Sequence, residues 1–123
     1  MANILIVDDS PTEIHVLSKL LKKDGHTVLT ASSGEESVEQ TLGSLPDLIV
    51  MDVVMPGMNG FKATRQIHRN TRTRHIPILM VTTKSQETDI EWGLSQGAAD
   101  YMVKPVDAKM FRVKVAELLQ GVS

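Results

Sequence analysis

The residues that could carry chemistry in this chain stand directly after short apolar runs. Asp8-Asp9 follow one run, Asp52 follows another, and Thr82-Thr83 and Lys104-Pro105 follow two more. If these runs are parallel strands, their carboxyl ends meet at one edge of a sheet, near the point where the strand order reverses. We therefore expect three carboxylates, a hydroxyl and an ammonium group to converge at that edge.

An acidic cluster of this kind predicts a divalent cation site. Like charges held close together raise each other's pKa, so the cluster is unfavourable unless a cation offsets it. Mg²⁺ takes oxygen ligands, usually one or two carboxylates with waters and a phosphate. Asp9 and Asp52, with Asp8 bound directly or through water, supply this set for Mg²⁺ or Mn²⁺. A nucleotide or flavin is not indicated, because the loop reads Ser10-Pro11 where a phosphate cradle would be glycine-rich.

A carboxylate beside Mg²⁺ and a lysine is equipped to attack a phosphoryl group. Aspartate is a known nucleophile in aspartyl-phosphate formation, and cations offset the charge on the transferring oxygens. Asp52 is therefore the candidate nucleophile and phosphoacceptor. Asp8 and Asp9 are suited to hold the metal. Lys104 is suited to contact a phosphoryl oxygen as a point charge, and Thr82 could donate its hydroxyl to the same group.

Five short apolar runs are expected to position these residues. Four of them are rich in Val, Ile or Leu without strict alternation, which is typical of strands buried on both faces. The run from Thr27 to Ala31 is more mixed and is expected nearer an edge of the sheet. The runs are Ile4 to Val7, Thr27 to Ala31, Leu48 to Met51, Ile78 to Val81 and Tyr101 to Val103.

The segments between the runs carry signals that start helices. Ser10 with Glu13, and Ser33 with Glu36, have the spacing of a capping box, in which serine and glutamate each bond the other's backbone N–H. Asp107 is placed to cap a last helix. The apolar positions on the expected helices are Ile14, Leu17 and Leu21, then Val38 and Leu42, then Phe61, Thr64 and Ile67, and finally Phe111, Val115, Leu118 and Leu119.

The fourth helix, from about Gln86 to Gln96, is the least regular of the five. Ile90, Trp92 and Leu94 do not form a clean apolar stripe, so this helix is expected to pack less firmly. Trp92 has two equally weighted interpretations, as a core residue or as an exposed contact for a partner.

Strand and helix alternate five times, which predicts an α/β doubly wound (βα)5 domain with a parallel sheet and helices on both faces. No linker or repeat interrupts the chain, so residues 1–123 are expected to form a single domain. A net charge of -2 and 3% aromatic residues argue against nucleic acid as a partner. The absence of cysteine, of a signal peptide and of a long apolar stretch predicts a cytoplasmic protein without membrane insertion.

Five motifs follow the expected strands in a fixed order. They are Val7-Asp8-Asp9, Met51-Asp52, Met55-Pro56-Gly57 with Asn59-Gly60, Val81-Thr82-Thr83, and Tyr101 with Lys104-Pro105. Together they resemble the full motif set of response-regulator receiver domains, the chemotaxis-regulator-like family. The match extends from about Ile4 to Leu119. A lone Asp-Asp pair would be weak evidence, whereas five ordered motifs at strand ends are specific.

The resemblance implies a flavodoxin-like strand order of 2-1-3-4-5 and a role in a two-component phosphorelay. A histidine kinase would pass a phosphoryl group to Asp52 in a Mg²⁺-dependent reaction that the receiver assists, so the chain would be a signalling protein and not an enzyme. The backbone carbonyl of Val54 would join the metal ligands. Thr82 would move toward the phosphoryl group and Tyr101 would turn inward, reshaping the face of the fourth helix, fifth strand and fifth helix for an effector protein.

A nearer similarity is to stand-alone regulators of type IV pilus twitching motility, which implies motility or chemotaxis-type signalling. It rests on Asp8 to Glu13, Asn59 to Arg65 and Thr82 to Asp89. The chain departs from the common family pattern at Thr83, where a smaller residue is usual. The resemblance implies that the positions of Thr83, Val54 and Lys84 govern the access of the hydrolytic water.

Other functions fit part of the sequence. A receiver can also act as a phosphate sink that drains a shared kinase. Phosphatases of the haloacid-dehalogenase type share the nucleophile and metal, but their general acid is an aspartate where this chain has Val54. A basic stretch could suggest nucleic-acid binding, but a solvated helix face and loop is the favoured interpretation. Its residues are Arg65, His68, Arg69, Arg72, Arg74 and His75.

Overall fold

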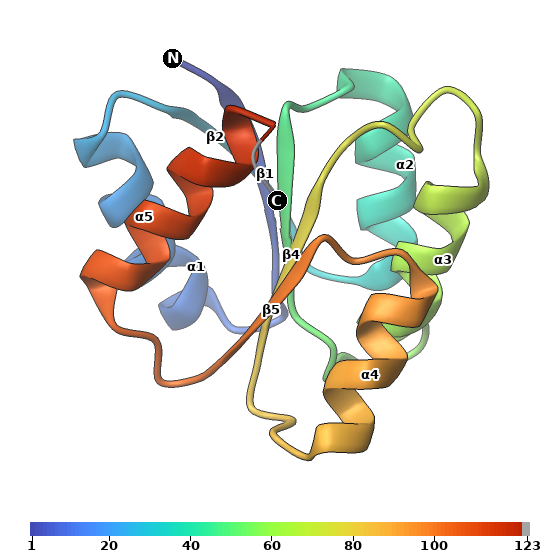
Figure 1. Ribbon diagram of the computed structural model, residues 1–123. Coiled ribbons are helices and arrows are strands. Elements are labelled where there is room, and N and C mark those ends of the chain that lie inside the picture. The colour runs from blue at the N-terminus through green and yellow to red at the C-terminus, as the bar shows by residue number, and fades with distance from the viewer. Residues whose placement is uncertain (122–123) are drawn as a thin grey trace.

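A computed structural model describes residues 1–121 as five strands and five helices in strict alternation (Figure 1). Residues 122–123 of the predicted domain lie outside the described part. The strands are β1 (Asn3–Val7), β2 (Thr27–Ala31), β3 (Leu48–Met51), β4 (Ile78–Thr82) and β5 (Asp100–Val103). The helices are α1 (Pro11–Lys23), α2 (Gly34–Ser44), α3 (Gly60–Arg69), α4 (Glu87–Gln96) and α5 (Ala108–Leu119).

The strands are all parallel and lie in the order β2-β1-β3-β4-β5, which confirms the predicted fold class and strand order. Each predicted run agrees with a strand to within one residue at either end. The register brings the carboxyl ends together, because Val7 lies beside both Ala31 and Met51, and Met51 lies beside Met80. Residues that follow β1 and β3 therefore emerge side by side at one edge.

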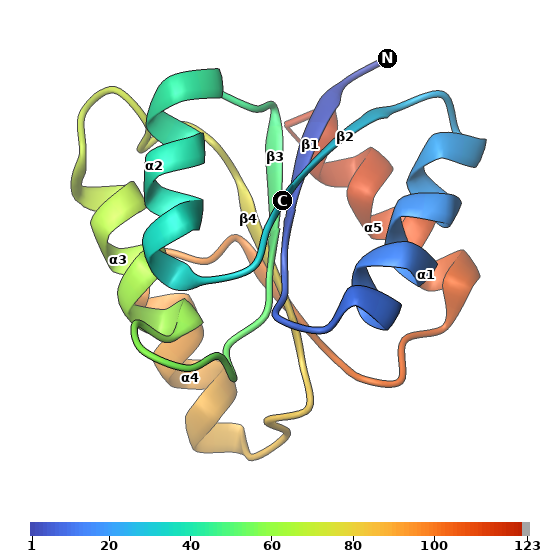
Figure 2. The same cartoon turned by 180° about the vertical axis from the view of Figure 1, so that it is seen from behind.

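Helices cover both faces of the sheet, as Figures 1 and 2 show, with α1 and α5 on one face and α2, α3 and α4 on the other. Successive side chains of a strand point to opposite faces. Ile4 and Ile6 of β1 accordingly pack in the cluster under α1 and α5, and Leu5 and Val7 pack in the cluster under α2 and α3. This double burial is why the central runs are apolar throughout.

The two edge strands are less buried than the central ones. The prediction that β2 lies at an edge is confirmed, but the prediction that the run in β5 is buried on both faces is wrong. Tyr101 and Met102 are half-buried and Val103 is exposed, because β5 has β4 alone as its neighbour in the described sheet. The cluster beneath α4 is also small, with Val53, Met80 and Ala98 as its buried members.

The start of α1 differs from a capping box in an informative way. Ser10 Oγ accepts a hydrogen bond from the Glu13 N–H at 3.3 Å, as predicted for an N-cap. The Ser10 N–H, however, donates to Asp8 Oδ1 at 2.9 Å and not to Glu13. Asp8 takes the place predicted for Glu13, so the Glu13 carboxylate is left to approach Lys104, with its Oε1 3.9 Å from Nζ.

The second predicted capping box, at Ser33 and Glu36, forms its serine hydrogen bond but not its glutamate hydrogen bond. Ser33 Oγ accepts from the Glu36 N–H at 3.1 Å, which confirms the N-cap of α2. The Glu36 carboxylate accepts from the backbone N–H and the hydroxyl of Ser32 instead of from Ser33. Serine at the preceding position offers two donors, which explains the exchange.

Two of the predicted helix faces are shifted. In α2 the buried positions are Gly34, Ser37 and Thr41, whereas Val38 and Leu42 are half-buried. In α3 Phe61 is half-buried, and the smaller Ala63 is buried in its place. Small residues on the inner faces let α2 and α3, which are in contact, pack close to each other and to the sheet.

The fourth helix begins one residue later than predicted, because Gln86 is its N-cap. Its weak packing is confirmed, since Gly93 is the one fully buried residue among those of α4. Trp92 is 53% exposed, which excludes its interpretation as a core residue. None of the helices within residues 1–121 has both the length and the apolar character needed to cross a membrane.

Candidate functional site

Three carboxylates converge at the carboxyl ends of β1 and β3. One ligand oxygen from each of Asp8, Asp9 and Asp52 lies within 4.8 Å of the others. Asp8 and Asp52 are buried, with 2% and 6% exposure, whereas Asp9 is exposed. The convergence expected from the strand ends is therefore present, and it places two carboxylates where solvent screens them poorly.

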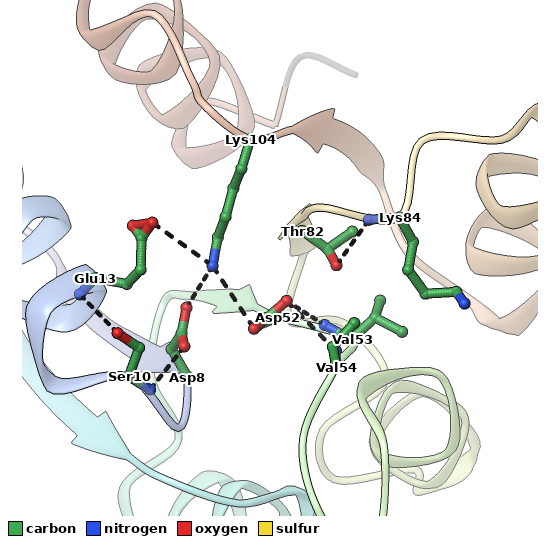
Figure 3. Close-up of polar contacts among 9 residues, drawn as sticks. All are labelled: Asp8, Ser10, Glu13, Asp52, Val53, Val54, Thr82, Lys84 and Lys104. Atoms are coloured by element: carbon green, nitrogen blue, oxygen red, sulfur yellow. Dashed lines mark hydrogen bonds and ion pairs between the residues drawn. The ribbon is translucent and has the colours of Figure 1, made fainter.

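Lys104, which follows β5, lies among these carboxylates (Figure 3). Its Nζ is 2.8 Å from Asp8 Oδ2, 3.6 Å from Asp52 Oδ2 and 3.9 Å from Glu13 Oε1. Burial lowers the pKa of Lys104, but the hydrogen bond to Asp8 and the charges of Asp52 and Glu13 outweigh it, so the pKa is raised overall. Lys104 is thus a fixed positive charge at neutral pH.

Asp52 is oriented by its own backbone neighbours. Its Oδ1 accepts a hydrogen bond from the Val53 N–H at 2.8 Å and faces the Val54 N–H at 3.4 Å. Its Oδ2 faces Lys104 (Figure 3). The two oxygens therefore have different surroundings, one against the backbone and one towards the lysine.

Burial raises the pKa of Asp52, and the charge of Asp8 raises it further, against the opposing effects of Lys104, the Thr82 hydroxyl and the Val53 N–H. A pKa above the usual value means that the folded protein disfavours the ionised carboxylate. A cation placed between the carboxylates would remove this penalty.

Asp52→Asn is expected to stabilise the metal-free protein at pH 7. Because the pKa of Asp52 is raised on folding, its ionised form weakens the fold above that pKa, and the penalty disappears as the pH falls below the ordinary value of 3.8. The free energy of unfolding in urea, measured for both proteins from neutral pH down towards pH 4, checks this. A variant that is less stable at pH 7, or a difference that does not change with pH, would contradict it.

The donor set fits Mg²⁺ on this geometry. Asp9 forms no hydrogen bond or ion pair with any residue of the described chain, so its carboxylate is available as a ligand beside those of Asp8 and Asp52. Three carboxylates against one lysine also leave negative charge for a divalent cation to offset. When bound, the ion would offset negative charge on phosphoryl oxygens. Val54, whose carbonyl the resemblance adds to the ligands, is half exposed beside Asp52.

Thr82 and Tyr101 both bond to the backbone of Lys84. Thr82 is fully buried and its Oγ1 accepts from the Lys84 N–H at 3.4 Å (Figure 3). The Tyr101 hydroxyl donates to the Lys84 carbonyl oxygen at 2.8 Å. Burial, with the charges of Asp89 and Asp52, raises the pKa of Tyr101 to about 12, so the hydroxyl keeps its proton. The backbone of Lys84 therefore links Thr82 at the end of β4 to Tyr101 in β5.

The sequence did not predict the contact of Glu13 with Lys104, nor the backbone role of Lys84, although Lys84 was expected beside the site. Glu13 was assigned to a cap, and its approach to Lys104 became visible only when Asp8 proved to hold the Ser10 N–H. Lys84 takes part through its backbone, which no side-chain pattern can reveal.

The loop that follows Asp52 ends at Gly60, where the start of α3 packs against the backbone of Asp52 and Val53. The Gly60 N–H donates to the Val53 carbonyl at 3.0 Å. A Cβ at Gly60 would lie 2.1 Å from the Asp52 carbonyl oxygen and 2.8 Å from Val53 Cα. Asn59 caps α3 by accepting from the Lys62 N–H at 3.0 Å. This motif therefore positions Asp52 and does not itself contact the carboxylates of the cluster.

Comparison with known families agrees with this geometry. The family model described as "Response regulator receiver domain" matches residues 4–116. The chain belongs to this family. The receiver resemblance predicted from the five motifs is thereby confirmed, and the chain is the receiver domain of a two-component response regulator.

A curated relative supports the nearer similarity as well. Protein PilH of Pseudomonas aeruginosa is 50% identical to this receiver over 121 residues, which cover 98% of this chain and 100% of the relative. Two further relatives match over only part of their length, with this receiver corresponding to 52% of one and 26% of the other.

Solved receiver structures have the same fold. A chemotaxis protein, CheY4 of Vibrio cholerae, superposes with a TM-score of 0.89 at 31% identity, covering 95% of this receiver and 98% of that chain. The receiver domain of a sensor histidine kinase from Pseudomonas aeruginosa PAO1 has a TM-score of 0.90 at 28% identity, covering 97% and 98%. That structure is described with a magnesium ion coordinated in the active-site cleft.

Proposed function

We propose that this receiver accepts a phosphoryl group on Asp52 from the phosphohistidine of a histidine kinase, with Mg²⁺ as cofactor. One observation carries the proposal: buried Asp52 has one carboxylate oxygen facing Lys104, within a cluster of carboxylates that fits a divalent cation. The magnesium ion described in a receiver structure of the same fold supports the choice of metal.

The surroundings of Asp52 suggest which atoms react. Oδ2 faces Lys104 and is not bonded to the backbone amides, so we assign it as the nucleophile. Its attack forms a P–O bond as the P–N bond to the donor imidazole breaks, and the electron pair stays on that nitrogen, which then takes a proton. Lys104 offsets charge on a phosphoryl oxygen, and Thr82 can donate its hydroxyl to the same group.

The ligands of the cofactor would be Asp8, Asp9 and Asp52 with the Val54 carbonyl. The phosphatase alternative receives no support, since Val54 stands where its general acid would be. The chain would then serve as a signalling protein that assists its own phosphorylation.

The output would pass through the face formed by α4, β5 and α5. Thr82 and Tyr101 support this route, because both bond to Lys84 and so connect the site to β5 and to the start of α4. The 50% sequence identity to Protein PilH, together with the motif similarity to twitching-motility regulators, supports a role in pilus-related signalling. The proposed location is the cytoplasm. The whole of residues 1–123 would act as one receiver that contacts proteins and neither nucleic acid nor membrane.

Phosphorylation by a small donor tests the proposal. With acetyl phosphate and Mg²⁺, mass spectrometry is expected to show one phosphoryl group per chain, on the peptide that contains Asp52. EDTA is expected to slow incorporation at least about tenfold, because the charge on the transferring oxygens is then opposed by Lys104 alone. Incorporation on a serine or threonine peptide, or an equal rate in EDTA, would argue against the proposal.

A further inference from the structure

A groove between α3 and α4 takes no part in the proposed phosphoryl transfer. The two helices lie side by side on one face of the sheet (Figures 1 and 2). The groove has a volume of about 420 Å³ and is lined by Phe61, Lys62, Arg65, Arg69, Trp92 and Gln96, among others. A second hollow of about 220 Å³ continues it along Arg65, Arg69 and Trp92. The His68 ring packs against Gly97 and joins the two helices at their far ends.

One wall of the groove is cationic and uncompensated. Lys62, Arg65 and Arg69 recur at helical spacing and so lie along one side of α3, and all three are exposed. No carboxylate of residues 1–121 forms an ion pair with any of them. The sequence from Val53 to Gln86 contains neither Asp nor Glu. This wall therefore carries free positive charge on a chain whose net charge is -2.

Aromatic side chains from both helices give the groove an apolar part. Trp92 is 53% exposed, and half-buried Phe61 lies across from it on α3. A large exposed aromatic side chain beside a hollow is typical of a contact that binds a partner. Arginine can also stack on the indole face when a ligand orders it.

We propose that this groove binds an acidic segment of a partner protein, which places an apolar side chain against Trp92 and Phe61 and carboxylates against Lys62, Arg65 and Arg69. The proposal rests on charge complementarity and on the shape of the groove. Carboxylates match the forked donors of arginine, and the hollow is of a size to take one or two side chains. The groove shares α4 with the α4, β5 and α5 face proposed for the effector, but it involves neither β5 nor α5.

An extended polyanion fits the groove less well. Glu87 and Glu91 are exposed on α4, and neither lines the groove or the hollow that continues it. A nucleic-acid backbone or an anionic membrane crossing both helices would meet these carboxylates, whereas a short segment lying along the α3 wall would not. The groove is also a hollow of about 420 Å³ with cationic side chains in its lining, whereas a membrane contact needs a broad apolar face.

Titration of the unphosphorylated protein tests this inference, so its failure is distinct from failure of the proposed phosphorylation. The probe is a short synthetic peptide with leucine and phenylalanine at its centre and glutamates on both sides. Trp92 is the one tryptophan in the chain, so its fluorescence reports directly on the groove. We expect a change in Trp92 emission and ¹⁵N chemical-shift changes confined to α3 and α4, with a dissociation constant on the order of micromolar to millimolar.

Matched variants locate the contact. Arg65→Ala is expected to weaken binding about tenfold, or roughly 1.4 kcal/mol, because it removes one positive charge from the groove, and Arg65→Glu is expected to abolish binding because it reverses that charge. Arg65 is exposed, so neither change should disturb the fold. Lys19→Ala removes one equally exposed cation from α1, away from the groove, and is expected to change nothing. Raising the salt concentration should weaken binding, and a peptide with lysines in place of the glutamates should not bind.

Several results would overturn the inference. One is the absence of any fluorescence or chemical-shift response to the acidic peptide at millimolar concentration. Another is chemical-shift changes outside α3 and α4, and a third is a loss of binding in Lys19→Ala equal to that in Arg65→Ala. Duplex DNA, vesicles of phosphatidylcholine with phosphatidylglycerol, and concentrated protein alone serve as competing occupants. Tighter binding of any of these through Arg65 and Trp92 would replace the proposed partner by nucleic acid, membrane or a second copy.

Discussion

Asp52→Asn is expected to lower phosphoryl incorporation from acetyl phosphate with Mg²⁺ to the background of the reaction without protein. The amide has almost the same shape as the carboxylate, and its oxygen can still accept from the Val53 N–H. It lacks the anionic Oδ2 that faces Lys104 in the wild type. Since an amide nitrogen is not a nucleophile towards phosphorus, the change removes the reaction and leaves the fold. Intact-protein mass spectrometry after a fixed incubation measures the effect.

Asp107→Asn is the matched control for this variant. Asp107 is an exposed aspartate that caps α5 by accepting from the backbone N–H groups of Lys109 and Met110, and asparagine caps a helix equally well. It should be phosphorylated like the wild type. Full incorporation into Asp52→Asn would sink the assignment of the acceptor. Loss of incorporation in both variants would show that the assay reports something other than the acidic site.

Gly60→Ala is expected to lower the free energy of unfolding by about 2–4 kcal/mol. The added Cβ would lie 2.1 Å from the Asp52 carbonyl oxygen and 2.8 Å from Val53 Cα, and these are backbone atoms that cannot turn aside. Relief requires the start of α3 to move away from the end of β3, which also displaces Asp52. Urea unfolding followed by circular dichroism gives the stability, and phosphorylation of the folded variant is expected to be slower.

Gly43→Ala separates this steric effect from the general properties of glycine. Gly43 lies inside α2, and a Cβ there would meet no atom within 4 Å. Alanine favours the helix at such a site by about 0.5–1 kcal/mol. The two substitutions should therefore change stability in opposite directions. Two destabilised variants, or an unchanged Gly60→Ala, would show that the close approach of Gly60 to the backbone of Asp52 is not what requires glycine there.

The central fold was predictable because one physical cause produces the pattern. A strand covered by helices on both sides buries every residue, so Leu48 to Met51 and Ile78 to Val81 are apolar throughout and their boundaries could be recognised. β5 has a similar composition but lies at an edge, and the apolar pattern alone does not distinguish the two. The inner face of α2 was missed because close helix packing there uses Ser37 and Thr41, which hydrophobicity ignores.

The acidic cluster was predictable from the same topology, since parallel strands bring their carboxyl ends to one edge. The hydrogen-bond and ion-pair partners of the residues in the cluster could not be predicted from the sequence. The capping spacing of Ser10 and Glu13 has two solutions, and only the three-dimensional position of Asp8 decides between them. The groove between α3 and α4 depends on residues about thirty positions apart, such as Lys62 and Trp92, whose proximity the sequence does not state.

The small cluster beneath α4 affects the free energy needed to shift this helix. Val53, Met80 and Ala98 are the buried residues there, whereas the cluster under α2 and α3 has ten. Local opening of α4 exposes less apolar surface than opening of the other helices, so it is opposed less strongly. The amide protons of Glu87 to Gln96 should therefore exchange with solvent sooner than those of the other helices. Converting a population from 1:99 to 99:1 takes about 5.5 kcal/mol of differential interaction. Because few buried residues contact α4, a shift of this helix breaks little apolar packing, and less of that free energy has to offset lost contacts.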